Sequence, residues 1–423
     1  MTTHSMVRRT TALVVLAGTL LIQGCSDDGD EATDTSDSPT TTAAPDTTLP
    51  SGSETTAAAP DTTAVPVVTD ERAFKVMVIG DETATISFTV PEAVPAVQGA
   101  LADLPNVEVL HCNSKGDSNA AVECERDAIA AGVAAVIVSF GAVGQDQTLL
   151  TEAGIPVLGG SSASAPTAFS ISSGLGAYAA LGAAAGAAEC TKIGTLYLDG
   201  AEFLADMIEQ GAALQDVEEV ARSPIPQNTP DIAPQVAALT QSDADCIVLS
   251  VTPSQAIQAV TAINQSGTEA KMVAAGAVFP QHVIDELGDL TEGLVLAESS
   301  LSPADESPVI AEIKADMAAF DADASVTTIG ILSWASAQLI IDALPLIEGD
   351  VTPEALLAAL LSLENAPAGG AVHPVTAEVI DNPLFSHFFN PWALLYRITD
   401  GVPARITEDY FSTTEVLQQA SMS

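Results

Sequence analysis

From Phe74 onward the sequence predicts an α/β fold of two lobes, each built on a parallel β-sheet and joined to the other by a hinge. Short runs rich in Val, Ile and Leu alternate with amphipathic segments of helical length, a pattern typical of βαβ units. The runs come in two series of four, separated by an Ala-rich segment at 175–190. About 350 residues follow Glu71, which is enough for two domains of ordinary size.

Strands and helices are expected to alternate through both series. Strands are predicted at 74–80, 107–112, 134–140, 155–160, 192–199, 246–251, 271–277 and 293–299. Helices are predicted at 91–104, 119–132, 145–154, 175–190, 203–216, 231–241, 254–266 and 281–288. Ser118-Asn119 and Pro253-Ser254 are typical of helix starts.

The pattern changes after Ser300. Three helices are expected in a row, followed by two strands, at 308–322, 325–347, 352–364, 392–399 and 404–407. Because these late helices must pack on lobes already begun, the chain has to cross back between the lobes. The resulting assignment is 71–189 with about 303–375 for the first lobe, 190–302 with about 376–410 for the second, and 411–423 for a tail.

The N-terminus predicts export. Arg8 and Arg9 precede an apolar run, Thr11 to Ile22, of about 12 residues, too short for a bilayer span of roughly 20. The next residues, Gln23-Gly24-Cys25, complete a stretch that resembles the lipobox of bacterial lipoproteins. The resemblance implies a signal peptide at 1–24 and a membrane anchor through lipidated Cys25. The alternatives are an ordinary signal peptide with an incidental cysteine, or a cytosolic protein with an apolar start.

A flexible stalk is expected at 25–70. Ser26 to Asp70 consists mainly of Thr, Ala, Pro, Asp and Ser, without an aromatic residue, Lys or Arg, and Ala-Ala-Pro-Asp-Thr-Thr occurs in it twice. Such a segment buries too little apolar surface to offset its ordering entropy. Loss of residues 1–24 removes two arginines and no acid, so the formal charge changes from −44 to −46. This balance argues against nucleic acid as a partner.

Four cysteines remain beside Cys25, and an even number in an exported protein predicts two disulfides. Cys112 and Cys124 could form a local bridge, and Cys190 and Cys246 could join neighbouring elements, although sequence alone leaves the connectivity open. No CxxC is present, so no metal site is expected.

Several motifs, taken in order, resemble one family. They are 111–120 (HCNSKGDSNA), 132–138 (GVAAVIV), 152–157 (EAGIPV) with the Gly/Ser-rich 159–164, 192–199 (KIGTLYLD) and 290–293 (LTEG). Over 74 to about 410 the chain resembles type I periplasmic solute-binding proteins, most closely the branched-chain amino acid group that feeds ABC transporters. The resemblance implies two Rossmann-like lobes that close on a small ligand.

Ligands of open parallel sheets bind beyond the carboxyl ends of strands. The residues expected there on the first lobe are Ser139, Phe140, Gly141, Ala142, Ser161, Ser162 and Ser164. Those on the second lobe are Phe203, Thr252, Ser254, Gly276 and Phe279, with Phe203 where the family commonly places an aromatic ring. Backbone N–H groups of such loops suit a carboxylate or another acceptor-rich group.

The predicted site departs from the amino-acid binders at three positions. Their ammonium-binding carboxylates align with Gly174 or Leu175 and with Gly276, and an expected threonine is Ala163. The site is therefore expected to lack the acids that a zwitterion needs, which leaves open a more neutral solute such as an amide.

The sequence contains little that indicates an enzyme or a bound cofactor. Gly174-x-Gly176-x-x-Ala179 nearly matches a dinucleotide fingerprint, but the chain is exported and the preceding run is only weakly apolar. No cofactor is expected, and the sequence holds no G-x-S-x-G, H-E-x-x-H or P-loop motif. We therefore expect a lipid-anchored, extracytoplasmic protein that delivers a small solute to an ABC permease. A ligand sensor of the same fold and a secreted hydrolytic enzyme are the alternatives.

Overall fold

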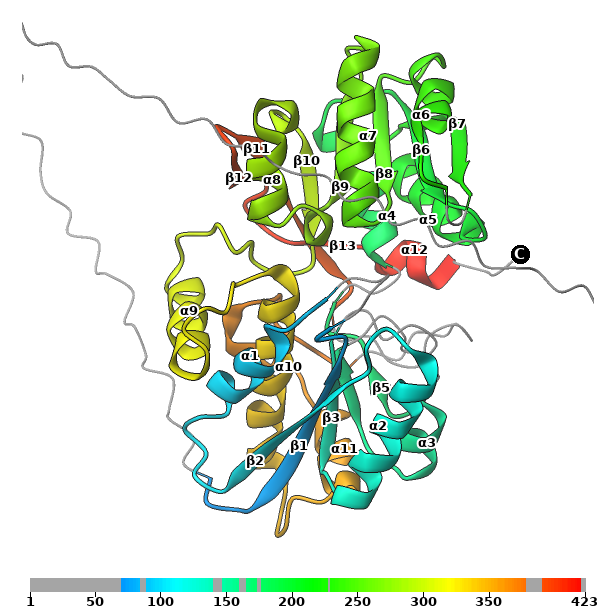
Figure 1. Cartoon of the computed structure of the whole chain (residues 1–423). Helices are drawn as coiled ribbons and strands as arrows, with labels where there is room; N and C mark the ends of the chain where they lie inside the picture. The colour runs from blue at the N-terminus through cyan, green and yellow to red at the C-terminus, as the bar shows by residue number, and fades with distance from the viewer. Residues whose placement is uncertain are drawn as a thin grey trace, which may run out of the picture. The chain divides into compact units, whose positions relative to one another are not determined.

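The computed structural model describes residues 70–83, 89–139, 147–159, 165–172, 176–226, 229–377 and 390–419, which belong to one compact unit (Figure 1). The expected signal peptide, Cys25 and most of the expected stalk lie outside these residues.

The first lobe is built on a five-stranded, wholly parallel sheet in the order β2-β1-β3-β4-β5. Its strands are β1 (Phe74–Gly80), β2 (Val107–Asn113), β3 (Ala135–Val138), β4 (Val157–Gly159) and β5 (Ala168–Phe169). Alternate residues of β1 serve two cores, because side chains alternate across a strand. Val76 and Val78 contribute to one core, and Met77 and Ile79 contribute to the other. The apolar runs are continuous because helices cover both faces of the sheet.

Helices from two distant parts of the chain cover the first sheet (Figure 1). The early ones are α1 (Ala93–Ala100), α2 (Ser118–Ala131) and α3 (Thr148–Glu152), and the late ones are α9 (Pro308–Phe320), α10 (Thr328–Ala343) and α11 (Pro353–Leu360). The segment Thr328–Leu346 is apolar and long enough to cross a membrane by composition alone. However, 67% of its most apolar window is buried inside the protein, where it packs against β3 and β4. It is therefore the central core helix of this lobe.

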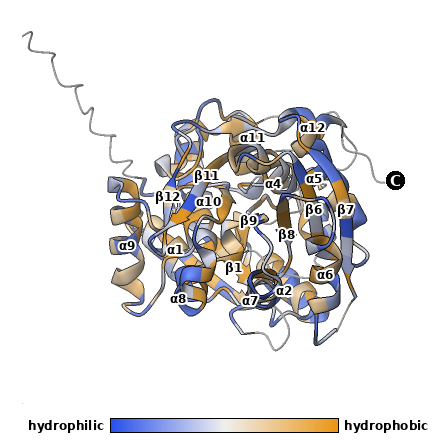
Figure 2. Ribbon diagram, turned by 90° about the horizontal axis from the view of Figure 1, so that it is seen from above, coloured by the Kyte–Doolittle hydropathy of each residue, from blue (hydrophilic) through white to orange (hydrophobic). Residues whose placement is uncertain are grey.

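The second lobe is built on an eight-stranded sheet in the order β12-β11-β10-β9-β8-β6-β7, with β13 pairing to β11. Its strands are β6 (Lys192–Leu198), β7 (Glu218–Ile225), β8 (Cys246–Ser250), β9 (Lys271–Ala275), β10 (Val295–Glu298), β11 (Trp392–Thr399), β12 (Val402–Arg405) and β13 (Phe411–Ser412). Strand β11 is antiparallel to β10, β12 and β13. Figure 2 shows hydrophobic residues dominating the enclosed strands, such as β8.

Helices also cover both faces of the second sheet. They are α4 (Gly176–Ala187), α5 (Glu202–Ala213), α6 (Ala233–Thr240), α7 (Pro253–Ser266) and α8 (Gln281–Leu287). Helix α4 packs on α5 through Gly182 and Gly211, where an added Cβ would lie 2.0 Å from a backbone oxygen of the other helix. The predicted boundary at residue 189 puts α4 in the first lobe, and this prediction is wrong, since α4 packs on the second sheet.

All eight strands of the two predicted series are present, mostly with shorter bounds. Four of the described strands and α-helices are not predicted from the sequence: the two-residue strand β5, the edge strand β7 of mixed polarity, and β13 and α12 (Thr414–Gln419) within the assigned tail. Leu417 of α12 is fully buried, so this C-terminal segment is part of the fold.

Asn390 connects segments that pass between the lobes. Its Nδ2 group donates to the carbonyl oxygens of Ile171 and Ser299, each at 2.8 Å. Ile171 follows the last strand of the first sheet, Ser299 leaves β10, and Asn390 precedes β11. The side chain is fully buried, so one amide joins three segments of the chain that lie between the two sheets.

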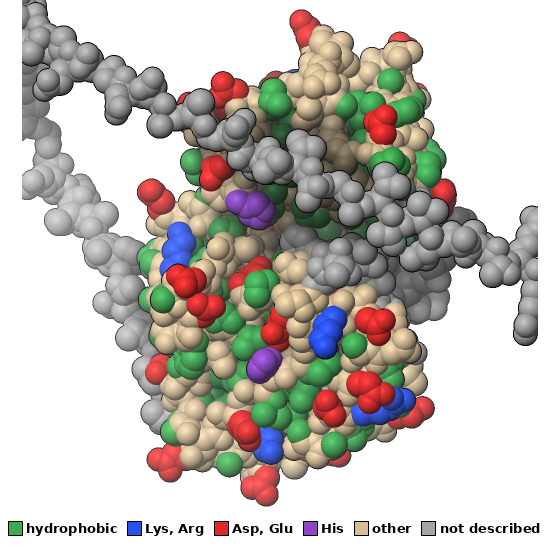
Figure 3. Space-filling model, in the orientation of Figure 1, with side chains coloured by type: hydrophobic (Ala, Val, Ile, Leu, Met, Phe, Trp, Pro, Cys, Tyr) green, Lys and Arg blue, Asp and Glu red, His purple; other side chains and the backbone are tan. Residues whose placement is uncertain are grey.

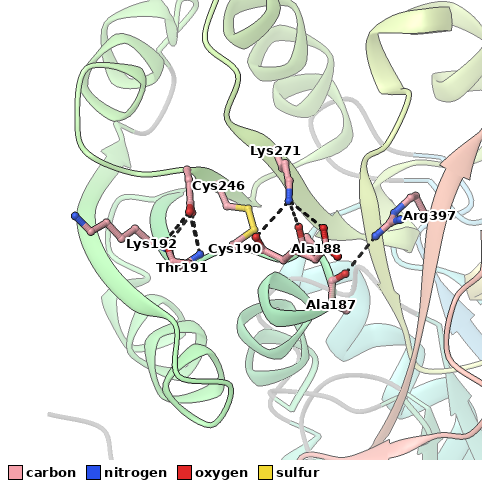
Figure 4. Close-up of a disulfide and its surroundings, with 10 residues drawn as sticks. Ala187, Ala188, Cys190, Thr191, Lys192, Cys246, Lys271 and Arg397 are labelled. Atoms are coloured by element: carbon pink, nitrogen blue, oxygen red, sulfur yellow. Dashed lines mark hydrogen bonds and ion pairs between the residues drawn. A yellow bond between two sulfur atoms is a disulfide. The ribbon is translucent and has the colours of Figure 1, made fainter.

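The structure contains the two expected disulfides and settles their connectivity, which the sequence left open, as Cys112–Cys124 and Cys190–Cys246. Figure 4 shows the second one where α4 leads into β6. Lys271 donates to the carbonyl of Ala188 and Arg397 to that of Ala187, so two cations cap the C-terminal end of α4.

Candidate functional site

A cavity of about 440 Å³ lies where elements of both lobes meet. The first lobe contributes the segment before α1 and the N-terminal end of α10, whereas the second lobe contributes the carboxyl ends of β8, β9 and β10. The polar and charged side chains around it are Thr89, Glu92, Gln281, His282, Glu298, Ser302, Ser325, Thr327 and Thr328. We call this cavity the cleft. Its volume is within the range of small-molecule sites.

Glu298, the last residue of β10, forms part of the second-lobe wall of the cleft. The residue is only 6% exposed, and the Thr328 hydroxyl donates to its Oε1 and Oε2 at 3.1 and 3.2 Å. Its carboxyl group occupies the space beside Gly276, since a Cβ added there would lie 1.8 Å from Oε1. Glycine at position 276 therefore makes room for the acid.

Glu92 provides a second acid from the first lobe, directly before α1. It is 7% exposed, and Thr327 donates to its Oε1 at 2.5 Å. Thr327 also caps α10 by accepting the Gly330 N–H at 3.1 Å. Two consecutive threonines at the start of α10 thus hold one acid from each lobe.

Burial raises the pKa of both carboxyl groups, that of Glu298 to about 8. The threonine hydroxyls oppose this shift, while the nearby Asp305 carboxylate adds to it for Glu298. Glu298 is therefore mainly a neutral acid at pH 7 in the absence of a ligand.

This raised pKa gives the stability of the protein a defined pH dependence. The folded state holds the Glu298 proton more tightly than the unfolded state, so the stabilisation is lost as pH rises from about 4.3, the unfolded value, to about 8. We expect Glu298→Gln to raise Tm at pH 8.5 and to change it little at pH 4, as scanning calorimetry can measure. The matched control is Glu269→Gln, which replaces an exposed acid. An equal Tm change for Glu298→Gln at both pH values would contradict the buried neutral acid.

A separate, smaller cavity of about 30 Å³ lies at the carboxyl ends of β3 and β4. It is lined by Val138, Ser139, Gly159, Ser172, Ile329, Leu332, Ser333 and Ser336. A cavity of this size has room for one or two water molecules.

The structure brings together only part of the predicted site. Gly276 and Phe279 line the cleft, and Ser139 lines the smaller cavity. Phe203 in the first turn of α5, and Thr252 and Ser254 at the start of α7, line neither of the two cavities. The other predicted residues, Phe140, Gly141, Ala142, Ser161, Ser162 and Ser164, lie outside the described residues.

Glu92 and Glu298 were not among the predicted site residues. The expectation of a site without acids is corrected for the cleft, because Glu298 comes from the strand next to Gly276. One signal was available in the sequence: Glu298 lies near the end of the otherwise apolar strand 293–299. Acids in buried strands are rare unless they are paired, so this residue was a candidate for a role in a site.

The described lining of the cleft contains no Lys or Arg. Figure 3 shows acidic side chains spread over this face of the molecule, with few basic ones among them. The net charge of −44 gives the surroundings the same sign. An anionic solute would therefore enter against the field of the protein.

Comparisons with known proteins agree with this architecture. The family of periplasmic binding proteins matches residues 73–378. Among solved structures, a substrate-binding periplasmic protein from Ralstonia solanacearum is 20% identical (TM-score 0.65), covering 79% of this chain and 100% of that one. A leucine binding protein from Thermotoga maritima is 14% identical (TM-score 0.65), with coverages of 80% and 99%.

A third structure, a fatty acid ABC transporter substrate-binding protein from Thermomonospora curvata, is 16% identical (TM-score 0.66), with coverages of 83% and 95%. No curated protein matches the sequence. At these identities the solved structures establish the fold, and the match over 73–378 establishes the family. The chain therefore belongs to the periplasmic binding protein family and has its type I fold.

Proposed function

We propose that this protein is a lipid-anchored, extracytoplasmic solute-binding protein that captures a small organic molecule and delivers it to an ABC permease. The cleft carries the proposal, because its walls come from both lobes and its volume suits a small solute. Lipidation of Cys25 and the stalk at 25–70 would keep the binding domain near its membrane partner.

Capture rests on differential binding. A ligand that contacts both walls of the cleft stabilises the closed arrangement of the lobes over the open one. Closure of the lobes would bend the segments that cross between them. Asn390 joins these segments by its hydrogen bonds to Ile171 and Ser299. Members of this family are binding proteins, so no chemical step on the solute is proposed.

The fold does not identify the solute. The similar structures named above include a leucine binding protein and a fatty acid transporter component, whose ligands differ in charge and size. Ligand identity has to come from the side chains of this cleft.

A thermal-shift screen of the full chain in detergent, followed by calorimetry of each hit, tests solute capture. We expect an increase in Tm and unchanged solute after incubation. Turnover of the solute would favour an enzyme. Co-purification of a permease from the native membrane supports delivery, whereas a receptor kinase as sole partner would favour sensing.

Phe203 lines neither cavity in this structure, so Phe203→Ala tests whether closure of the lobes brings its ring against the solute. If it does, the substitution should weaken the affinity for any hit by about tenfold, because an aromatic ring against a ligand contributes on the order of 1 kcal/mol. Phe203 is the second residue of α5 and follows the carboxyl end of β6. Gly276 follows the carboxyl end of β9, at the same edge of the sheet. The matched control is Phe320→Ala on α9, where the ring is 49% exposed and does not line the cleft. Titration calorimetry measures both variants, and an unchanged affinity would remove Phe203 from the site.

A further inference from the structure

The cleft presents one buried acid from each lobe. Glu298 accepts from the Thr328 hydroxyl, and Glu92 accepts from the Thr327 hydroxyl and from its own backbone N–H. A carboxylate can accept about four hydrogen bonds, so both groups keep acceptor capacity that a ligand could use.

The construction around Glu298 is specific. Any side chain at Gly276 would collide with the carboxyl group, and Thr328 orients this group from the facing lobe. The acid is therefore built into the wall of the cleft and does not extend into solvent from its rim.

No cation compensates an ionised Glu298 among its described neighbours. Asp305 is a nearby acid whose Oδ2 accepts the Tyr396 hydroxyl at 2.5 Å. The phenols of Tyr396 and Tyr410 feel the charge of Glu298, and their pKa values are raised, mainly by burial. The other titratable groups that line the cleft are Glu92 of the first lobe and His282 of α8. A cationic ligand could therefore supply the positive charge that the surroundings of Glu298 lack.

We propose that Glu298 is the specificity-determining residue of the cleft, and that it selects solutes carrying a protonated amine. The proposal rests on the proposed function of solute capture. When such a solute binds, the O–H bond of the Glu298 carboxyl group breaks and its proton passes to the buffer. The ammonium N–H then donates to the resulting carboxylate, with Glu92 as the second acceptor from the opposite lobe. No bond of the solute changes.

A neutral amide and a carboxylate are the competing ligand classes. A protonated Glu298 could donate to an amide carbonyl, which would bind without release of a proton. A carboxylate would face Glu92 and Glu298 without a cation among the described lining, and this repulsion disfavours its binding in a partly desolvated site. The two acids and the net charge of −44 favour the amine.

The test uses matched solutes. Butyl, benzyl and cyclohexyl skeletons, each as primary amine, amide, alcohol and carboxylate, are screened by thermal shift against the full chain in detergent. We expect at least one amine to bind more tightly than its three partners. Stronger binding of an amide, alcohol or carboxylate would overturn the proposal and leave solute capture intact. Binding of none of the twelve compounds would count against both.

The linkage to protons adds a second readout. For a ligand that needs the ionised acid, the association constant rises by about tenfold per pH unit below the pKa of Glu298. Calorimetry in buffers of different ionisation enthalpy should find about one proton released per amine bound at pH 7. Proton uptake, or an affinity independent of pH, contradicts the proposal.

Glu298→Gln keeps the shape of the neutral acid and is expected to fold, with Tm as the check. It should weaken amine binding at least tenfold and abolish proton release. Glu202→Gln, on the exposed first turn of α5, is the control and should change neither. Glu298→Gln with unchanged amine affinity would exclude Glu298 as the selecting group.

Discussion

Replacement of Asn390 by alanine should destabilise the folded protein by about 2–6 kcal/mol, because two buried carbonyl groups would lose their donor at about 1–3 kcal/mol each. The carbonyls belong to Ile171 and Ser299, and the amide that serves them is fully buried. Urea unfolding followed by circular dichroism measures the loss.

Asn264→Ala is the matched control for this substitution. Its Nδ2 group also donates to two carbonyls, those of Val260 and Leu290, but the residue is exposed, so water can replace the lost donor. Its cost should stay below about 1 kcal/mol. A similar cost for both variants would mean that the crossing segments do not depend on Asn390.

Loss of the Cys190–Cys246 disulfide is expected to have the second large effect. The bridge spans 56 residues, and the chain-entropy relation predicts a stabilisation of about 4 kcal/mol for a loop of that length. Cys112–Cys124 spans 12 residues, for which the same relation predicts about 3 kcal/mol. We expect the Cys190→Ala/Cys246→Ala variant to unfold at the lower urea concentration of the two double variants.

The folded state should survive the loss of the longer bridge, because other contacts hold the same junction. Asp245 accepts the N–H groups of Thr191 and Lys192, and Lys271 and Arg397 cap α4. Native circular dichroism without urea is therefore the control. A cost near zero would show that these contacts alone determine the geometry.

The sequence predicted the strands that are buried on both faces and the helices that separate them. Short, continuous apolar runs are typical of strands that are buried on both faces, as in β3, where all four residues are buried. It did not predict β7, whose residues are mostly half-exposed and of mixed polarity, so the period-2 signal is weak. The sequence does not assign α4 to the correct lobe, because small residues pack equally well against either sheet. Its contacts with β8, β9, β10 and β11 and with α5 decide between them.

The candidate site was harder to predict than the fold. Strand ends locate loops, and Gly276 and Phe279, which were predicted from one such end, line the cleft. Their contact with a ligand stays a prediction. Glu298 could not be found by matching positions to a family pattern, since it reaches the space beside Gly276 from the neighbouring strand. Such a contact depends on register between β9 and β10, which one sequence does not reveal.

The return of the chain to the first lobe also sets the order in which the protein can be completed during synthesis. Helix α10 contributes Trp334 and Ile340 to the core beneath β3 and β4, but it is made after the second lobe has begun. A nascent chain that ends near residue 300 has α1 on this face of the first sheet but lacks α10, so β3 and β4 keep apolar surface exposed to water until α10 is made.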